Sequence, residues 1–337
     1  MKVSFLAVGF AFAAATMTQG AAGQSASVDI REWEVPYENS RPRDPFAVSG
    51  DSVWFVGQRS GYLAHLNPET GDIHKIDLKD GSGPHNLIVG SDGVVWYAGN
   101  RTALIGRYDP VSDSIEEIPM PDPAARDPHT LIFDADESHI WFTLQGANMI
   151  GRMNIETRAV DLVPSLTESS RPYGIKLAPD GSVWVVLFGT SKLARVDPET
   201  MEITEIDLPR DDARPRRLEV LDDGLVYYVD YAGGRLGQYD PDAGAFQEWV
   251  MPQGEGARPY GMASDAQGRL WAVATGVQPN IFVGFDPEAE KWVSQTEVPS
   301  GGGTIRHMHY HEPTGAVWFG TDTNYVGRAV VVDPAGE

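Results

Sequence analysis

The chain has 337 residues, 42% of them hydrophobic, with 36 Gly, 24 Pro and no Cys. This composition allows a buried core and many tight turns, and it excludes disulfides, thiolate metal sites and a Cys nucleophile. The formal net charge of −22 disfavours binding to nucleic-acid phosphates and to an anionic membrane surface.

The N-terminus has the pattern of a secretory signal peptide. Lys2 gives a positive start, an apolar run follows, and small residues come after it. We expect a signal peptide over residues 1–22, with cleavage near Ala22 and Ala26 as the alternative site. No later segment approaches the ~18 apolar residues that a membrane helix needs. We therefore expect a soluble protein that is periplasmic or secreted, with no membrane insertion.

The rest of the chain repeats one pattern seven times. An aromatic residue in an apolar run recurs every 42–47 residues, and an Asp or Asn near a turn recurs at the same step. The aromatic positions are Trp54, Trp96, Trp141, Trp184, Tyr227, Trp271 and Trp318. The Asp or Asn positions are Asn67, Asp109, Asn154, Asp197, Asp240, Asp286 and Asp333. Because two independent markers agree, we infer seven structural repeats.

Each repeat predicts four short strands. In the second repeat the apolar run Leu87–Val89 gives the first strand, and the Asp92-Gly93 turn leads into the aromatic run Val94–Tyr97. A polar loop precedes a third run, Leu104–Tyr108, and the segment Ser114–Pro121 predicts the fourth strand. Four short strands in a repeat of this length are typical of a propeller blade.

The count of fourth strands predicts how the ring closes. Only three residues follow Asp333-Pro334, so the seventh repeat has no fourth strand of its own. The segment Ile30–Pro36 matches that strand type and precedes the first repeat. We therefore predict an all-β, seven-bladed β-propeller as a single domain over residues 28–337, in which an N-terminal strand completes the last blade and removes its open edge.

The repeated motif resembles the streptogramin lyase (virginiamycin B lyase) family. It consists of Pro with His, Tyr or Arg, then Asp-Gly-x-x-Trp, then Ile-Gly-Arg-x-Asp, and it is clearest at Asp127–Arg152. The similarity spans Arg31–Asp333. It implies a carbon–oxygen lyase that opens a cyclic depsipeptide at its ester by β-elimination. A His would remove the proton beside a carbonyl, and Mg²⁺ would stabilise the developing enolate.

The residues that the resemblance implies for this chemistry are not matched. A Glu is implied three positions after a repeat's aromatic residue, where Asp230 is the only acid among the seven repeats. A His is implied in the late slots that hold Tyr260 and Arg306, and a Glu is implied where Thr304 stands. The Mg²⁺ ligands are thus unmatched, and we assign no metal residue and no cofactor.

The residue that follows the Pro in each repeat is the main candidate for binding. In a propeller these seven positions, called the slot ring below, surround one mouth of the central channel. Arg suits carboxylate or phosphate, and neutral His can act as a base. We expect the slot ring to bind an anionic small molecule, or alternatively to bind neighbouring carbonyls and channel water. Its members are Arg43, His85, His129, Tyr173, Arg216, Tyr260 and Arg306.

Roles within the slot ring follow from its chemistry. If the bound molecule is turned over, His129 or His85 is the expected base, and Arg216 or Arg306 the expected partner of the enolate or carboxylate. The three arginines need a counter-charge, for which Asp44, Asp127 and Asp230 are candidates.

Other positions near this mouth are candidates as well. Asp230 lies fourteen residues after Arg216 and is either its ion-pair partner or a general base. Gln145 and Asn148 lie in a loop that faces the same mouth, as ligand contacts or, for Asn148, as a turn residue.

Three alternating histidines, His307, His309 and His311, share one strand face. The first two could share a metal, but the favoured interpretation is ordinary core or solvated histidine.

Two alternative functions remain open. Lactone hydrolysis, as in gluconolactonase-type propellers, needs convergent Glu, Asp and Asn ligands for a divalent cation, which the slots do not supply. An interaction platform would use the acidic outer surface to dock another exported protein, and its affinity should fall steeply with salt.

Overall fold

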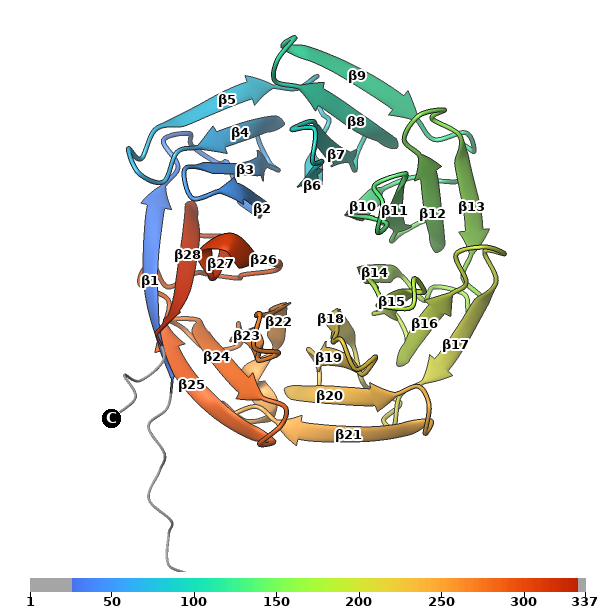
Figure 1. Cartoon of the computed structure of the whole chain (residues 1–337), viewed down its shortest axis with the longest axis vertical. Coiled ribbons are helices and arrows are strands. Elements are labelled where there is room, and N and C mark those ends of the chain that lie inside the picture. The colour runs from blue at the N-terminus through green and yellow to red at the C-terminus, as the bar shows by residue number, and fades with distance from the viewer. Residues whose placement is uncertain (1–25, 333–337) are drawn as a thin grey trace, which may run out of the picture.

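The structure is a computed structural model that describes residues 26–332. Seven four-stranded antiparallel sheets surround a central axis as blades, which confirms the predicted seven-bladed propeller (Figure 1). The expected signal peptide, residues 1–22, lies outside the described residues. Helical structure within residues 26–332 is limited to two 3-10 turns, η1 (Glu255–Ala257) and η2 (Glu312–Thr314). No helix in this range has the length and hydropathy of a membrane span.

Every blade runs from an inner strand at the axis to an outer strand at the rim. The inner strands are β2 (Pro42–Ser49), β6 (Pro84–Val89), β10 (Pro128–Phe133), β14 (Pro172–Leu177), β18 (Pro215–Val220), β22 (Pro259–Ser264) and β26 (Met308–His311). The second strands are β3 (Ser52–Gly57), β7 (Val95–Gly99), β11 (His139–Leu144), β15 (Val183–Leu187), β19 (Val226–Asp230), β23 (Leu270–Ala274) and β27 (Ala316–Gly320). The third strands are β4 (Tyr62–Leu66), β8 (Leu104–Asp109), β12 (Met149–Asn154), β16 (Lys192–Val196), β20 (Arg235–Asp240), β24 (Ile281–Asp286) and β28 (Tyr325–Val332). The outer strands are β5 (Ile73–Asp77), β9 (Ser114–Pro119), β13 (Val160–Pro164), β17 (Ile203–Asp207), β21 (Ala245–Val250), β25 (Lys291–Glu297) and β1 (Ser27–Glu34).

The first strand closes the ring as predicted. β1 pairs antiparallel with β28 along its whole length, from Ser27 opposite Val332 to Glu34 opposite Tyr325. The Trp33 ring stacks on Trp318 of β27 with centroids 5.5 Å apart. The blade that would otherwise end in an open edge is therefore completed by the opposite end of the chain (Figure 1).

The hydrophobic core lies between neighbouring blades. One cluster joins Ile88 and Trp96 of the β6–β9 blade to Leu131 and Phe142 of the β10–β13 blade. Because each inter-blade layer needs apolar residues on both of its faces, every blade contributes buried side chains from alternating positions of its inner and second strands.

The Ile-Gly-Arg part of the repeat has a packing explanation. Gly151 lies opposite Phe142 in the β11–β12 ladder, and a Cβ there would come within 2.3 Å of the Phe142 ring. The next residue, Arg152, lies opposite Trp141, with its Cζ 5.4 Å from the ring. At this position the glycine leaves room for the Phe142 ring, and the arginine covers the neighbouring Trp.

The Asp or Asn marker forms the turn between the third and outer strands. The Oδ1 of Asp109 accepts hydrogen bonds from the backbone N–H groups of Val111 and Ser112, at 2.9 and 3.3 Å. The same pair of bonds recurs at Asn67, Asn154, Asp197, Asp240 and Asp286. The marker thus recurs because six blades need the same side-chain-capped turn, and the seventh marker, Asp333, lies outside the described residues.

Candidate functional site

The slot ring lies at the start of the inner strands, at one mouth of the channel. In five blades the slot residue and the residue after it interrupt the ladder to the second strand, as His129 and Thr130 do between the Pro128 and Leu131 pairs. Such irregularities change the direction of side chains, so two successive residues can face the axis.

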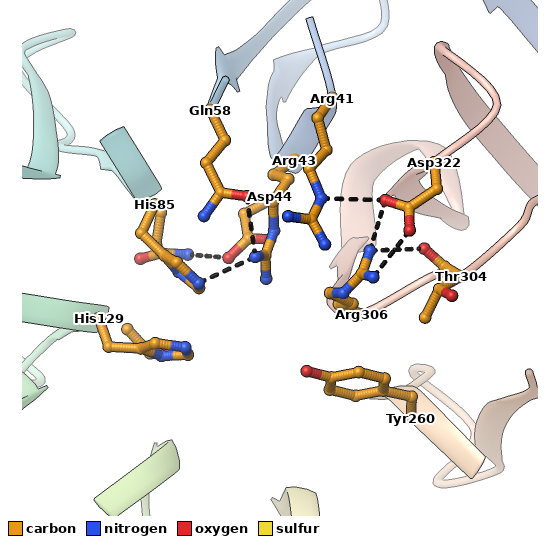
Figure 2. Close-up of polar contacts among 12 residues, drawn as sticks. Arg41, Arg43, Asp44, Gln58, His85, His129, Tyr260, Thr304, Arg306 and Asp322 are labelled. Atoms are coloured by element: carbon orange, nitrogen blue, oxygen red, sulfur yellow. Dashed lines mark hydrogen bonds and ion pairs between the residues drawn. The ribbon is translucent and has the colours of Figure 1, made fainter. Parts of the chain in front are cut away.

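Most of the slot ring forms a continuous chain of contacts. The Nη1 of Arg43 donates to Nε2 of His85 at 2.9 Å. The rings of His85 and His129 lie 3.7 Å apart between centroids, and those of His129 and Tyr173 lie 4.0 Å apart. The hydroxyls of Tyr173 and Tyr260, which come from the two blades that flank the β18–β21 blade, form a hydrogen bond. Figure 2 shows Arg43, His85, His129 and Tyr260 around this central space.

Arg216 occupies an aromatic environment. Its Cζ lies 4.2 Å from the ring centroid of Phe188, 4.7 Å from that of Tyr231, 4.9 Å from that of Tyr260 and 5.6 Å from that of Tyr173. Stacking of this kind stabilises a guanidinium while leaving its N–H edges available for a ligand.

Two of the three slot arginines have carboxylate partners. Arg43 lies beside Asp44, with Nε and Oδ1 3.4 Å apart. Arg306 donates to both oxygens of Asp322, at 2.5 and 2.7 Å, and Arg41 donates to the same carboxylate at 3.1 Å (Figure 2). Asp44 therefore provides a counter-charge, as expected from the sequence, and Asp322 is a second one that the sequence did not indicate.

Asp230 and Asp127 do not provide the counter-charge considered for the slot arginines. Asp230 pairs with Arg210, not with Arg216, and its Oδ1 accepts the N–H groups of Arg214 and Ala232. The carboxylate of Asp127 accepts the backbone N–H groups of the loop that follows β11. Both acids come from the expected region, but nearer donors in their own blades use their oxygens.

Gln145 and Asn148, both in the loop after β11, have different surroundings. The Oδ1 of Asn148 accepts hydrogen bonds from the Ser170 hydroxyl and the Arg171 N–H, and its Nδ2 donates to the Thr167 carbonyl. With a φ of 61°, Asn148 has the conformation of a turn residue. Gln145 is half-buried.

His85 and His129 are neutral at pH 7 because of their surroundings. Burial lowers the pKa of both well below the ordinary value, and the guanidiniums of Arg43 and Arg217 add to the effect. Because Arg43 can only donate, Nε2 of neutral His85 must accept, which places the His85 proton on Nδ1. His129 Nδ1 is bonded to the Thr130 hydroxyl at 2.8 Å.

The Tyr173–Tyr260 pair has two contrasting phenols. Burial alone would raise the pKa of Tyr173, but the charges of Arg43, Arg217 and Arg216 and the hydrogen bond from Tyr260 bring that pKa below its ordinary value. Burial raises the pKa of Tyr260, and the neighbouring Tyr173 raises it further. The first proton to leave this pair is therefore the one on Tyr173.

A second polar layer lies beneath the slot ring. Arg217 donates to the Thr130 hydroxyl at 3.0 Å and to the Arg306 carbonyl at 3.0 Å, and Asn86 donates to Asp44 at 3.0 Å. Of the residues that follow the slots, only Asp44 and His307 were singled out in the sequence, whereas Asn86, Thr130 and Arg217 were not. Their signal is a polar or small residue at a strand start, which is weak by itself.

The three alternating histidines separate into different surroundings. Burial lowers the pKa of His307 well below its ordinary value and that of His309 to about 3. The His309 ring stacks on Phe46 with centroids 4.1 Å apart, and His311 is bonded to the Thr314 hydroxyl at 2.8 Å. These contacts agree with the core interpretation.

The residues at the mouth do not fit the Mg²⁺ site that the family resemblance implies. Asp44, Asp230 and Asp322 each face an arginine. No group of three or more His, Asp or Glu side chains between residues 26 and 332 is arranged to hold a metal ion. The donors offered at the mouth are cationic or neutral, which suits an anion.

A hollow of about 620 Å³ opens at the mouth between the blades that begin with β14, β18 and β22. Its lining includes Arg171, Arg214, Arg216, Arg258, Phe188 and Tyr231 and contains no carboxylate.

Only Arg216 of these arginines was predicted. The other three precede the slot prolines, and their signal in the sequence is an Arg-Pro pair, which occurs in four repeats, at Arg41, Arg171, Arg214 and Arg258.

Comparison with known proteins identifies one family and several similar structures. A model of the virginiamycin B lyase family matches residues 12–282 and 158–333. Virginiamycin B lyase from Staphylococcus aureus has a structure similar to this one, with a TM-score of 0.81 at 20% identity over 90% of this chain and 100% of that chain. A streptogramin B lyase structure gives a TM-score of 0.80 at 20% identity, over 90% and 98% of the two chains.

Other comparisons are less close. The extracellular domain of a hybrid two-component system from B. thetaiotaomicron gives a TM-score of 0.68 at 13% identity, over 89% of this chain and 42% of that one. No curated protein matches the sequence significantly. At these identities, similarity to the solved structures supports the fold alone.

Proposed function

Because the chain belongs to the virginiamycin B lyase family, we propose that it is an exported member that binds an anionic small molecule at the mouth of its channel. The observation that carries the proposal is the hollow lined by Arg171, Arg214, Arg216 and Arg258 without a carboxylate. In a chain of net charge −22, such a group of cations is a local reversal of sign. Guanidinium groups bind carboxylate and phosphate through paired hydrogen bonds.

Arg216 is the central contact in this proposal. Arg43 pairs with Asp44, and Arg306 shares Asp322 with Arg41, whereas no ion pair involves Arg216 anywhere in residues 26–332. Its Nε is buried and has no hydrogen-bond partner among the described residues. A buried donor without a partner costs about 1–3 kcal/mol, so an anion that accepts a hydrogen bond from this N–H would recover that free energy.

Turnover by β-elimination, the family chemistry, would require a base at the same mouth. We assign this role to His129 and not to His85, because Nε2 of His85 already accepts from Arg43. His129 is neutral, and its Nε2 has no partner in the described part of the chain. The proposal contains no step through Mg²⁺, since the residues present do not fit its ligand set.

A thermal-shift series tests binding. Small carboxylates and phosphates at millimolar concentration should raise the melting temperature of the wild type. Arg216→Ala should weaken binding by roughly 1.5–3 kcal/mol, which is the range for a hydrogen bond to a charged group. Because Arg216 packs against four aromatic rings, Arg171→Gln is a second variant on an exposed side chain. Arg195→Ala, which removes an exposed arginine paired with Asp180, is the matched control.

Two results would contradict the proposal. One is the absence of any anion-dependent stabilisation of the wild type. The other is an equal anion-dependent rise in melting temperature for the wild type, the control and both site variants. That result would assign the arginines of the hollow a structural role.

Export to the periplasm or beyond is part of the proposal and is supported by the N-terminal signal pattern. The mass of the secreted chain, compared with the mass expected after cleavage near Ala22 or Ala26, tests it. An uncleaved chain found only in the cytoplasm would contradict it.

A further inference from the structure

The arginines that line the hollow differ from other arginines at the mouth in whether they have an acidic partner. Arg41, Arg43 and Arg306 each have an aspartate partner. Arg210, in the loop before β18, pairs with Asp230 and Glu248. These four arginines outside the hollow therefore have carboxylate partners, with Asp322 shared by Arg41 and Arg306, whereas Arg217 beneath the slot ring donates only to the Thr130 hydroxyl and the Arg306 carbonyl.

The four arginines of the hollow have no such partner. No ion pair involves Arg171, Arg214, Arg216 or Arg258 within the described range, and no acidic side chain lines the space between them. Arg214 donates through Nη1 to the carbonyls of Asp211 and Ala213, which orients it without neutralising it. Four positive charges around one open space remain for the ligand to neutralise.

Aromatic contacts hold two of these guanidiniums in place. The Cζ of Arg171 lies 5.6 Å and that of Arg216 lies 4.2 Å from the ring centroid of Phe188. An arginine stacked on a ring presents its N–H groups at the edge of the guanidinium plane, in the fork that matches two oxygens of a phosphoryl group. A monocarboxylate carries one charge and two oxygens, so it would leave most of these donors unused.

From this geometry we infer that the anion bound at the mouth is a phosphate monoester in its dianionic form, held by Arg171, Arg214, Arg216 and Arg258. The inference rests on the proposed function and specifies its ligand class. A phosphate monoester presents three terminal oxygens and a charge close to −2 at neutral pH, with a second pKa of about 6. Free phosphate shares this chemistry, and the experiment separates the two sources.

The experiment is isothermal titration of the full chain with four probes at low ionic strength: methyl phosphate, inorganic phosphate, dimethyl phosphate and acetate. Methyl phosphate is a dianion at pH 7.5, whereas dimethyl phosphate and acetate are monoanions. We expect methyl phosphate to bind at least tenfold more tightly than either monoanion at pH 7.5. At pH 5 methyl phosphate is itself a monoanion, and this advantage should disappear.

The protein contributes little to that pH dependence. His85 and His129 are the titratable histidines of the slot ring, and burial keeps their pKa values well below the ordinary one. Tyr260 has a raised pKa. Tyr173 has a lowered pKa, and Asp127, which interacts with Arg171, has a raised one. A change between pH 5 and 7.5 that methyl phosphate shows and dimethyl phosphate does not therefore reports the second ionisation of the ligand.

A matched pair of variants places the site. Arg258→Gln removes an exposed arginine of the hollow, and its side chain has no hydrogen bond or ion pair to the rest of the described chain, so folding should be unaffected. Methyl phosphate should then bind at least tenfold more weakly. Arg126→Gln removes an exposed mouth arginine outside the hollow and should leave the affinity unchanged.

The outcomes separate the inference from the proposed function. If dimethyl phosphate or acetate binds as tightly as methyl phosphate, the dianion inference is wrong and the anion site stands. If no probe binds, both are wrong. If Arg258→Gln and Arg126→Gln weaken binding equally, general charge is responsible and the inference is wrong. If inorganic phosphate matches methyl phosphate, the phosphoryl dianion is supported with free phosphate as a sufficient ligand.

Discussion

Replacing Trp33 by Ala should weaken the closure of the ring. Trp33 lies on β1, is 7% exposed and stacks on Trp318 at an interplanar angle of 23°. The guanidiniums of Arg31 and Arg328 lie over the same ring, with Cζ 4.6 and 5.8 Å from its centroid. Because β1 and β27 belong to opposite ends of the chain, this contact exists only when the ring is closed.

The magnitude follows from the area that the ring buries. A buried Trp removes roughly 150–250 Å² from water, which at ~25 cal/mol/Å² corresponds to about 4–6 kcal/mol as an upper bound. Substitutions of buried Phe or Trp by Ala cost about 3–5 kcal/mol. With an unfolding entropy of about 2.1 cal/mol/K per residue, a ring of roughly 300 residues should melt about 5–8 °C lower.

Differential scanning calorimetry of the wild type and Trp33→Ala measures the effect. Trp249→Ala is the control, because Trp249 packs on Phe285 with centroids 4.8 Å apart but is half-buried and lies on β21, inside a blade that is continuous in sequence. A chain that begins at Tyr37 should show a larger fall in melting temperature than Trp33→Ala, because it lacks β1 altogether. If Trp33→Ala lowers the melting temperature no more than Trp249→Ala does, ring closure does not contribute the stability assigned to it.

Two further predictions concern the core and the slot ring. Tyr173 should ionise at a lower pH than ordinary tyrosine, because Arg43, Arg216 and Arg217 outweigh its burial, and a near-ultraviolet tyrosinate titration should lose its first transition in Tyr173→Phe. Because the folded-state pKa of Tyr173 is depressed, its ionised phenol stabilises the wild type fully above the unfolded pKa of about 10. This stabilisation is lost as the pH falls through the folded-state pKa. Identical titrations of the wild type and Tyr173→Phe would contradict the assignment. Gly151→Ala should cost about 1–3 kcal/mol by overpacking, because its Cβ would lie 2.3 Å from the Phe142 ring. In urea unfolding, Gly256→Ala is its control because a Cβ at Gly256 meets open space, and equal midpoints for the two variants would refute the packing argument.

The repeat made the architecture predictable from the sequence. Most blades use the same local interactions, such as the turn capped by Asp109 and the Gly151 position opposite Phe142, so most repeats encode them again. Where the pattern of one repeat is ambiguous, the other six repeats show how to interpret it. The number and order of the strands therefore follow from the periodicity alone. The closing strand was predictable for the same reason, because one outer strand was missing at the end and one was in excess at the start.

The convergence of the slot ring was also predictable, because it follows from the symmetry of the fold. The pairing of individual charges was not. Asp230 lies at the expected spacing from Arg216, yet it pairs with Arg210, and Asp322 pairs with Arg306 and with Arg41 of a different blade. A repeat fixes where a residue lies within its blade, but it says nothing about the rotamer or the reach of a long side chain.

The sequence by itself thus determined the blades, their number, the closure and the ring of slot residues, since all of these depend on short-range patterns repeated along the chain. Only the tertiary structure decided which arginines are neutralised and which surround a hollow. Arg171, Arg214 and Arg258 are about 43 residues apart in neighbouring repeats, and they become neighbours when the blades are packed around the axis. Electrostatic pairing depends on distances of a few ångströms between loops of different blades, and these distances exist only after the ring has closed.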